Sequence, residues 1–295
     1  MADIYKSESG RREVERLYRR VLDRWPVPRE EIIVRTCHGD TFVVASGDRS
    51  APPVVLLHGS GANSGAWIRD VAVWAPHHRV YAVDMIGEPG LSAPSRPPLA
   101  SAAYAAWLDD VWDGLSVTSA SVVGLSLGGW LGLDYAVRRP ERVTSLSLLS
   151  PSGVGRQRYL ALLTLGVLKM CGTWGLRKSL RLVSGRGVEQ PRPVIDALLV
   201  VFRNFRPRME RVPLRSDVEL ASLSMPLQVI IGADDVLLRS KETRDRIERH
   251  VPDARIIFLE NVGHILPPQT IAVAEFLRAV TAGHTMLAVS DAVNA

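Results

Sequence analysis

The sequence predicts an α/β fold with one mainly parallel sheet, and three observations support this class. Short apolar runs alternate with stretches of helical period from residue 53 to 153, and the alternation returns after residue 218. Several of the apolar runs end in glycine-containing turns. The chain has 295 residues, of which 46% are hydrophobic, enough for one large core. Alternation of this kind predicts helices on both faces of the sheet.

The first elements precede this alternation. Residues 10–24 are predicted to form an amphipathic helix that ends at "WPVP", because five apolar residues recur at helical spacing: Val14, Leu17, Tyr18, Val21 and Leu22. The segments "EIIVRTC" (31–37) and "TFVVAS" (41–46) then predict the two strands of a hairpin.

The core strands and helices follow in turn. Six short, strongly apolar strands are expected within "PVVLLHGSG", "HRVYAVDMIG", "SASVVGLS", "TSLSLLSPSG", "PLQVIIGADD" and "ARIIFLENVGH". Helices are expected within "YAAWLDDVWDGLSV", "LGGWLGLDYAVRRPERV", "KETRDRIERHVP" and "QTIAVAEFLRAV". The ligand site of such a sheet lies at the carboxyl ends of its strands.

One long segment interrupts the alternation. Residues 154–217 hold two or three apolar helical stretches with no clear strand between them, which predicts a helical lid over the carboxyl edge of the sheet. Residues 1–153 and 218–283 would then form the core. Residues 284–295 show no firm pattern and are expected to be a flexible tail.

Composition excludes several classes of partner. The formal net charge is +5 and the pI about 9.5, but basic residues are scattered and interleaved with acidic ones, so no nucleic-acid surface is expected. Cys37 and Cys171 are the only cysteines, which excludes a disulfide scaffold and a cysteine-rich metal site.

The sequence predicts neither a secretory signal nor a membrane-spanning segment. The charged N-terminal residues are followed by no apolar segment, so a secretory signal is not expected. The most apolar stretch, 159–171, is too short to span a bilayer and carries Lys169. We therefore expect a cytoplasmic protein without membrane insertion.

A G-x-S-x-G motif, "GLSLG", lies between the strand "SASVV" and a helix, the setting of a nucleophile elbow. A serine on so sharp a turn adopts strained backbone angles, and side chains in place of Gly124 and Gly128 would collide with the strand and the helix. The setting favours Ser126 as a nucleophile. The alternative is that Ser126 caps the following helix.

A serine hydroxyl needs a base, and the base needs a carboxylate to orient it. His264 follows Gly263 in a loop just beyond an apolar strand, where an imidazole can reach Ser126; the alternative is a surface histidine. The strand "PLQVII" leads to Asp234 and Asp235, of which one is expected to face His264. An Asx-turn explains the other.

The loop "HGSG" after the first core strand predicts an oxyanion site. The backbone N–H groups of Ser60 and Leu127 are the expected donors, and Gly59 and Gly61 are expected to contact substrate. The loop is neither a phosphate-binding P-loop, because it lacks the Lys-Ser/Thr ending, nor a dinucleotide fingerprint, because Ser64 replaces the third glycine.

The segments "HGSG", "GLSLGG", "GADD" and "NVGH" are similar to those of α/β-hydrolases, over nearly the whole chain. The resemblance implies the α/β-hydrolase fold with an inserted lid, and it selects Asp235 as the acid, three residues after the glycine of "GADD". The order Ser126, Asp235, His264 is that of this family. Further segments, among them "LDRWPVP" and "YAVDMIGEPGLS", resemble small bacterial serine carboxylesterases.

The segment "DMIGEPGLS" departs from the D-x-x-G-x-G-x-S pattern of many α/β-hydrolases by one extra residue. We interpret the longer loop as a mark of the carboxylesterase subgroup. Glu88 within it is expected to face solvent in a turn, with a place at the pocket mouth as the alternative.

The expected function is hydrolysis of a small-molecule ester with an apolar acyl or aryl group, through an acyl-enzyme and without cofactor or metal. Trp67 and Trp130 are expected to contact substrate, or else to lie in the core. Alternatives within the fold are thioester, lactone or C–C bond hydrolysis; Leu125 and Ile265 count against the C–C bond hydrolases of ring-cleavage products. A ligand-sensing protein with little turnover is the alternative of another class. The oligomeric state is left open by the sequence.

Overall fold

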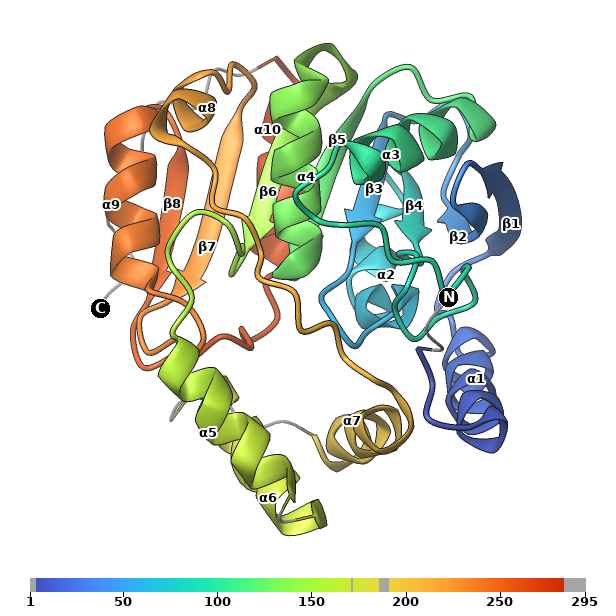
Figure 1. Ribbon diagram of the computed structural model, residues 1–295. Helices are drawn as coiled ribbons and strands as arrows, with labels where there is room; N and C mark the ends of the chain where they lie inside the picture. Colours follow the sequence, from blue (N-terminus) through green and yellow to red (C-terminus); the bar gives the residue numbers. More distant parts are fainter. Residues whose placement is uncertain (1–3, 171, 186–190, 284–295) are drawn as a thin grey trace.

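The computed structural model describes residues 4–170, 172–185 and 191–283 and confirms the predicted α/β class (Figure 1). The described residues form an eight-stranded sheet in the order β1-β2-β4-β3-β5-β6-β7-β8. Strand β2 pairs antiparallel with β1 and β4, and every other neighbouring pair is parallel. The predicted tail, 284–295, lies outside the described residues.

The strands lie where the sequence predicted them, with small differences at their ends. They are β1 (Arg29–Thr36), β2 (Gly39–Ser46), β3 (Pro53–Leu57), β4 (Arg79–Val83), β5 (Ala120–Leu125), β6 (Val143–Leu149), β7 (Leu227–Gly232) and β8 (Arg255–Leu259). The central parallel strands β3, β5 and β7 are buried on both faces, which explains their continuous apolar runs.

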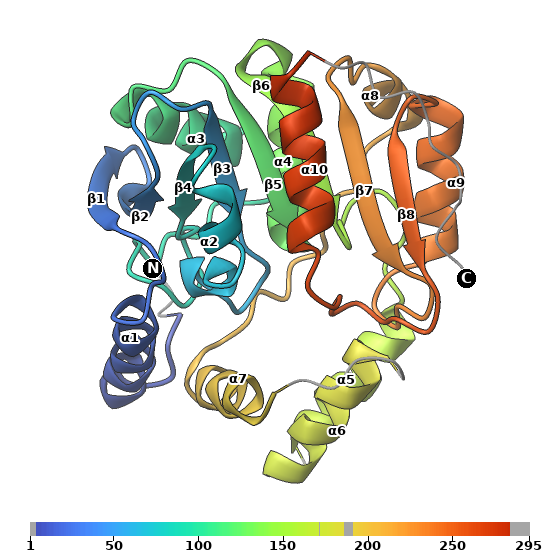
Figure 2. The same cartoon turned by 180° about the vertical axis from the view of Figure 1, so that it is seen from behind.

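Helices cover both faces of the sheet. Figure 1 shows α3 (Ala103–Gly114), α4 (Leu127–Arg138) and α9 (Ser240–His250) on one face. Figure 2 shows α2 (Val71–Trp74) and α10 (Thr270–Thr281) on the other. A separate buried apolar cluster fills each of the two layers between sheet and helices.

Some helix boundaries differ from the prediction, for local reasons. The first helix, α1, spans Glu8–Leu22 rather than 10–24, because the hydroxyl of Ser7 caps it by accepting from the N–H of Gly10. The helix predicted through residue 143 ends at Arg138, since Pro140 cannot continue it and starts a short 3₁₀ turn. The short helices α2 and α8 (Asp217–Ala221) had no predicted counterpart.

Three helices lie beyond the carboxyl ends of the strands: α5 (Tyr159–Met170), α6 (Gly172–Ser184) and α7 (Arg192–Asn204) (Figure 1). Helix α7 packs against the N-terminal segment in a small cluster that includes Tyr5 and Phe205, whose rings meet edge to face. We keep the name lid for residues 154–217, which contain these helices.

Within the part of the chain that the structure describes, no helix combines the length and the apolar character needed to cross a membrane.

Candidate active site

Ser126 occupies the turn between β5 and α4, where its backbone is strained. Its φ of 52° and ψ of −106° lie outside the regions that side-chain-bearing residues favour. Its N–H donates to the carbonyl of Leu149 on β6, which anchors the turn to the sheet. The hydroxyl makes no capping bond to α4, so the alternative role as a helix cap is not observed.

The glycines beside Ser126 make the turn possible. A Cβ on Gly124 would lie 2.5 Å from the carbonyl oxygen of Gly128, and one on Gly128 would lie 2.1 Å from that of Leu57. Neither contact is tolerable, because the obstructing atoms are backbone. The motif therefore lets α4 pass close to β3 and β5 while the serine side chain points out of the turn.

The structure brings the three predicted catalytic side chains into one hydrogen-bonded row. His264 Nε2 lies 2.8 Å from Ser126 Oγ, and its Nδ1 lies 2.7 Å from Asp235 Oδ2. His264 and Asp235 are buried, with relative exposures of 9% and 2%. With Nδ1 donating to the carboxylate, Nε2 is left as an acceptor for the serine proton.

Asp235 and its neighbour Asp234 have different surroundings. Asp235 Oδ1 accepts from the backbone N–H groups of Leu237 and Leu238, at 2.7 and 3.0 Å, which leaves Oδ2 for the imidazole. Asp234 is exposed. The residues alone left the choice between the two open, and the geometry agrees with the one made by family resemblance.

The loop that carries His264 is attached to the lid on both sides of the histidine. The N–H of Gly263 donates to the carbonyl of Ser184, and that of Ile265 donates to the carbonyl of Val183, at the end of α6. A Cβ on Gly263 would lie 2.4 Å from the Val183 carbonyl oxygen. The position of the imidazole therefore depends on α6, a dependence that no sequence pattern indicated.

The predicted oxyanion loop lies directly beside Ser126. A Cβ on Gly59 would be 3.6 Å from the Cβ of Ser126. The buried side chain of His58 holds the loop in place. Its Nε2 accepts from the N–H of Met85, and its Nδ1 lies 2.9 Å from the carbonyl oxygen of Gly59. Burial lowers the pKa of His58, which favours the neutral imidazole that this pair of contacts needs.

The two backbone N–H groups predicted as oxyanion donors are available to a substrate. Among the described residues, the N–H groups of Ser60 and Leu127 donate to no protein acceptor. The N–H of Gly61, in contrast, donates to a carboxylate oxygen of Glu88 at 2.6 Å. That N–H is therefore not free for substrate, and the substrate contacts predicted for Gly59 and Gly61 stay predictions.

The expectation that Glu88 faces solvent is wrong. Its relative exposure is 2%, and its carboxylate also lies 3.4 Å from the hydroxyl of Ser60. Burial raises the pKa of Glu88 to about 7, opposed by the Gly61 N–H, Arg96 and Arg208. The longer loop folds inward because Asp84 binds it: Asp84 Oδ2 accepts from the N–H of Leu91.

Asp84 is a buried organiser of the site that sequence reasoning did not single out. Its Oδ1 accepts hydrogen bonds from Tyr18 on α1 and from both the N–H and the hydroxyl of Ser64. The carboxylate thus ties the first helix, the oxyanion loop and the loop after β4 together. The sequence signal was the position of Asp84 directly after a buried strand.

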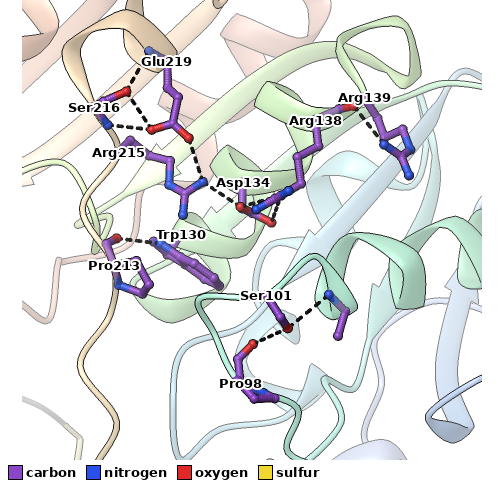
Figure 3. A network of polar contacts seen from close by, with 11 residues as sticks. Pro98, Ser101, Trp130, Asp134, Arg138, Arg139, Pro213, Arg215, Ser216 and Glu219 are labelled. Carbon is purple, nitrogen blue, oxygen red and sulfur yellow. Dashed lines mark hydrogen bonds and ion pairs between the residues drawn. The ribbon is translucent and has the colours of Figure 1, made fainter.

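The two tryptophans predicted to contact substrate lie in the core instead. Trp67 and Trp130 have relative exposures of 3% and 0%, and Trp67 packs on Trp74. Figure 3 shows that the indole N–H of Trp130 donates to the carbonyl of Pro213, near the end of the lid. The structure supports a packing role for both rings and gives no support to a substrate contact.

The described residues contain no group of three or more histidine, cysteine, aspartate or glutamate side chains arranged to hold a metal ion. The expectation of a reaction without metal or cofactor stays a prediction.

Comparisons with known proteins agree with this geometry. A family model described as "Alpha/beta hydrolase family" matches residues 54–279. Two relatives come from Bacillus subtilis (strain 168). "Uncharacterized carboxylesterase nap" is 32% identical over 256 residues, which are 84% of this chain and 85% of that protein. "Carboxylesterase YbfK" is 30% identical over 273 residues, 88% of this chain and 89% of that protein.

A solved structure gives the same picture in three dimensions. The crystal structure of carboxylesterase CesB (YbfK) from Bacillus subtilis superposes with a TM-score of 0.82 at 27% identity. The match covers 94% of this chain and 99% of that one. The similarity therefore extends through the lid as well as the sheet.

Proposed function

The chain belongs to the alpha/beta hydrolase family, and we propose that it uses this fold as a serine carboxylesterase. The observation that carries the proposal is the row Ser126–His264–Asp235, with distances of 2.8 and 2.7 Å, at the carboxyl edge of the sheet. Carboxylesterase relatives that match most of the chain support the reaction class.

In the proposed acylation step, His264 carries the proton from the nucleophile to the leaving group. Ser126 Oγ attacks the ester carbonyl carbon while His264 Nε2 takes the hydroxyl proton. Asp235 stabilises the imidazolium that forms and keeps the ring in its orientation. His264 then gives the proton to the leaving alkoxide, and the acyl group stays on Ser126.

The negative charge that develops on the carbonyl oxygen needs donors on the far side of the reacting carbon. The N–H groups of Ser60 and Leu127 are proposed to supply them, and one such donor contributes about 10²–10³ in rate. Water, deprotonated by the same imidazole, then attacks the acyl-enzyme and releases the acid. No step requires a cofactor.

The choice of substrate is proposed to depend on the lid. We propose that residues 154–217 act as a cap over the site and that the substrate carries an apolar acyl or aryl group. Helix α7 reaches the oxyanion loop, where a Cβ on Gly61 would lie 3.9 Å from the ring of Phe202. An aromatic ring next to the oxyanion loop favours an apolar group at this end of the substrate.

The test is a panel of p-nitrophenyl esters of increasing acyl length, extended by aryl esters, thioesters and lactones. The wild type is expected to hydrolyse the esters, and Ser126→Ala to lose at least a thousandfold in kcat. Ser222→Ala, an exposed serine at the end of α8, is the matched control and should behave as wild type. A wild type that is folded but inactive on the whole panel would refute the proposal.

Two adjacent aspartates give a second, sharper comparison. Asp235→Asn should lower kcat by about 10⁴ because the imidazole then loses its correct tautomer. Asp234→Asn, one residue away and exposed, should change kcat by less than about twofold. Equal losses in the two variants would contradict the assignment of the acid.

A further inference from the structure

We propose that Glu88 is a positioning residue for the reaction: its carboxyl group holds the oxyanion loop so that the Ser60 N–H stays free and faces the reacting carbonyl. This inference rests on the proposed esterase function. It assigns a role to a residue of the longer loop after β4.

The first support is how the loop distributes its N–H groups. The N–H of Ala62 donates to the carbonyl of Gly59 at 3.3 Å, and the N–H of Gly61 donates to Glu88 at 2.6 Å. The Ser60 N–H is thereby the one N–H from residues 60–62 without a protein acceptor among the described residues. Removing the Glu88 carboxyl would leave the Gly61 N–H unpaired and allow the Ser60–Gly61 peptide to rotate.

The second support is the rigidity of the frame around Glu88. The Arg96 guanidinium donates from Nε to the carbonyl of Gly87 and packs over the ring of Phe205. Pro89, the next residue, accepts at its carbonyl from the side chain of Asn63 at the far end of the oxyanion loop. Glu88 to Gly61 and Asn63 to Pro89 are therefore two of the several hydrogen bonds that join the two loops.

The third support is the cost of burying this group. A carboxyl that is 2% exposed is retained only where it makes hydrogen bonds, since burying an unpaired polar group is unfavourable. Burial raises its pKa to about 7, so both the ionised and the neutral form are present near neutral pH. Both forms offer an acceptor oxygen to Gly61. The positioning role therefore depends on the acceptor and not on the charge.

The experiment compares Glu88→Ala, which removes the acceptor, with Glu88→Gln, which keeps an amide oxygen in its place. Glu210→Gln is the matched control: Glu210 pairs with Arg208, whose charge also acts on Glu88, and accepts from the N–H of Leu99, but it makes no hydrogen bond to the oxyanion loop. Two readouts are measured at pH 8: the kcat and KM for p-nitrophenyl butyrate, and the amide hydrogen exchange of the peptide that contains residues 58–64.

Glu88→Ala is expected to lower kcat by about 10- to 100-fold with KM changed less than threefold, because the donor acts in the transition state. Its loop amides should exchange at least tenfold faster. Glu88→Gln and Glu210→Gln should stay within about threefold of wild type in both readouts.

Unchanged exchange of the loop in Glu88→Ala would overturn the inference, whatever the kinetics. A Glu88→Gln variant as impaired as Glu88→Ala would also overturn it, because charge rather than the acceptor would then be responsible. If the wild type hydrolyses no ester, the proposed function fails on its own, and hydrogen exchange still decides whether Glu88 holds the loop.

Discussion

At the scale of single residues, the sequence predicted best those positions where backbone sterics leave no choice. Gly124 and Gly128 are required because any side chain there would meet backbone atoms, and that requirement is visible in the motif. Glu88 was misjudged because the direction in which a loop folds depends on its partners. The Gly61 N–H that binds the Glu88 carboxylate lies 27 residues away in sequence.

Asp70 gives a residue-scale prediction for pH. Its carboxylate, just before α2, accepts from the hydroxyl of Thr270 at 2.5 Å, and burial raises its pKa to about 6 from the ordinary 3.8. Between these two pH values the folded protein holds a proton that the unfolded chain has lost. Raising the pH through this window therefore lowers the free energy of unfolding, by up to about 3 kcal/mol.

Asp70→Asn keeps an acceptor for Thr270 and removes the charge. We expect this variant to be more stable than wild type at pH 8, with the difference vanishing near about pH 3, where the wild-type carboxyl is mostly neutral in both states. Urea unfolding of wild type and Asp70→Asn, at pH 8 and at the low pH, measures this difference in stability. Asp253→Asn, in an exposed loop, is the control. A difference independent of pH would show that the ionisation of Asp70 is not responsible.

At the scale of elements, the strands and most helices followed from hydrophobic period, whereas the contacts between the lid and the core did not. The last residues of the lid are held against the nucleophile helix by Arg215, which donates to Asp134 on α4 at 2.7 Å (Figure 3). Both side chains are buried, and the guanidinium lies over the Trp130 ring. Sequence could not predict the pair, because its members are 81 residues apart.

The pair predicts a non-additive pattern of stability. Asp134→Leu alone leaves the buried Arg215 without its buried partner and should cost about 3–5 kcal/mol. The double variant Asp134→Leu with Arg215→Met should be clearly more stable than Asp134→Leu, because no uncompensated buried charge remains. The other partners of the pair, Arg138 and Glu219, keep 32% and 36% of their side chains exposed and can be solvated. Chemical unfolding measures both.

Glu248→Ala, which removes the exposed partner of a loose ion pair on α9, is the control and should leave the unfolding midpoint unchanged. Losses that simply add in the double variant would contradict a coupled buried pair.

At the scale of the whole molecule, the class and the order of the elements could be predicted because a parallel sheet buries both faces and needs crossover helices. The three side chains proposed for catalysis were predicted because each follows a strand at the same edge. Asp235 was chosen over Asp234 only by resemblance, since both follow the same strand and only the turn decides which is buried. Beyond an ester with an apolar acyl or aryl group, the substrate was not predicted, because it depends on how the lid packs.

The central claim is that Ser126 is a nucleophile activated by His264. Labelling of the folded protein by a fluorophosphonate, followed by digestion and mass spectrometry, tests it without requiring knowledge of the substrate. We predict a single phosphonyl adduct on Ser126 in the wild type, formed at least a hundredfold more slowly in His264→Ala. No adduct on the folded wild type, or an adduct on another residue, would contradict the account.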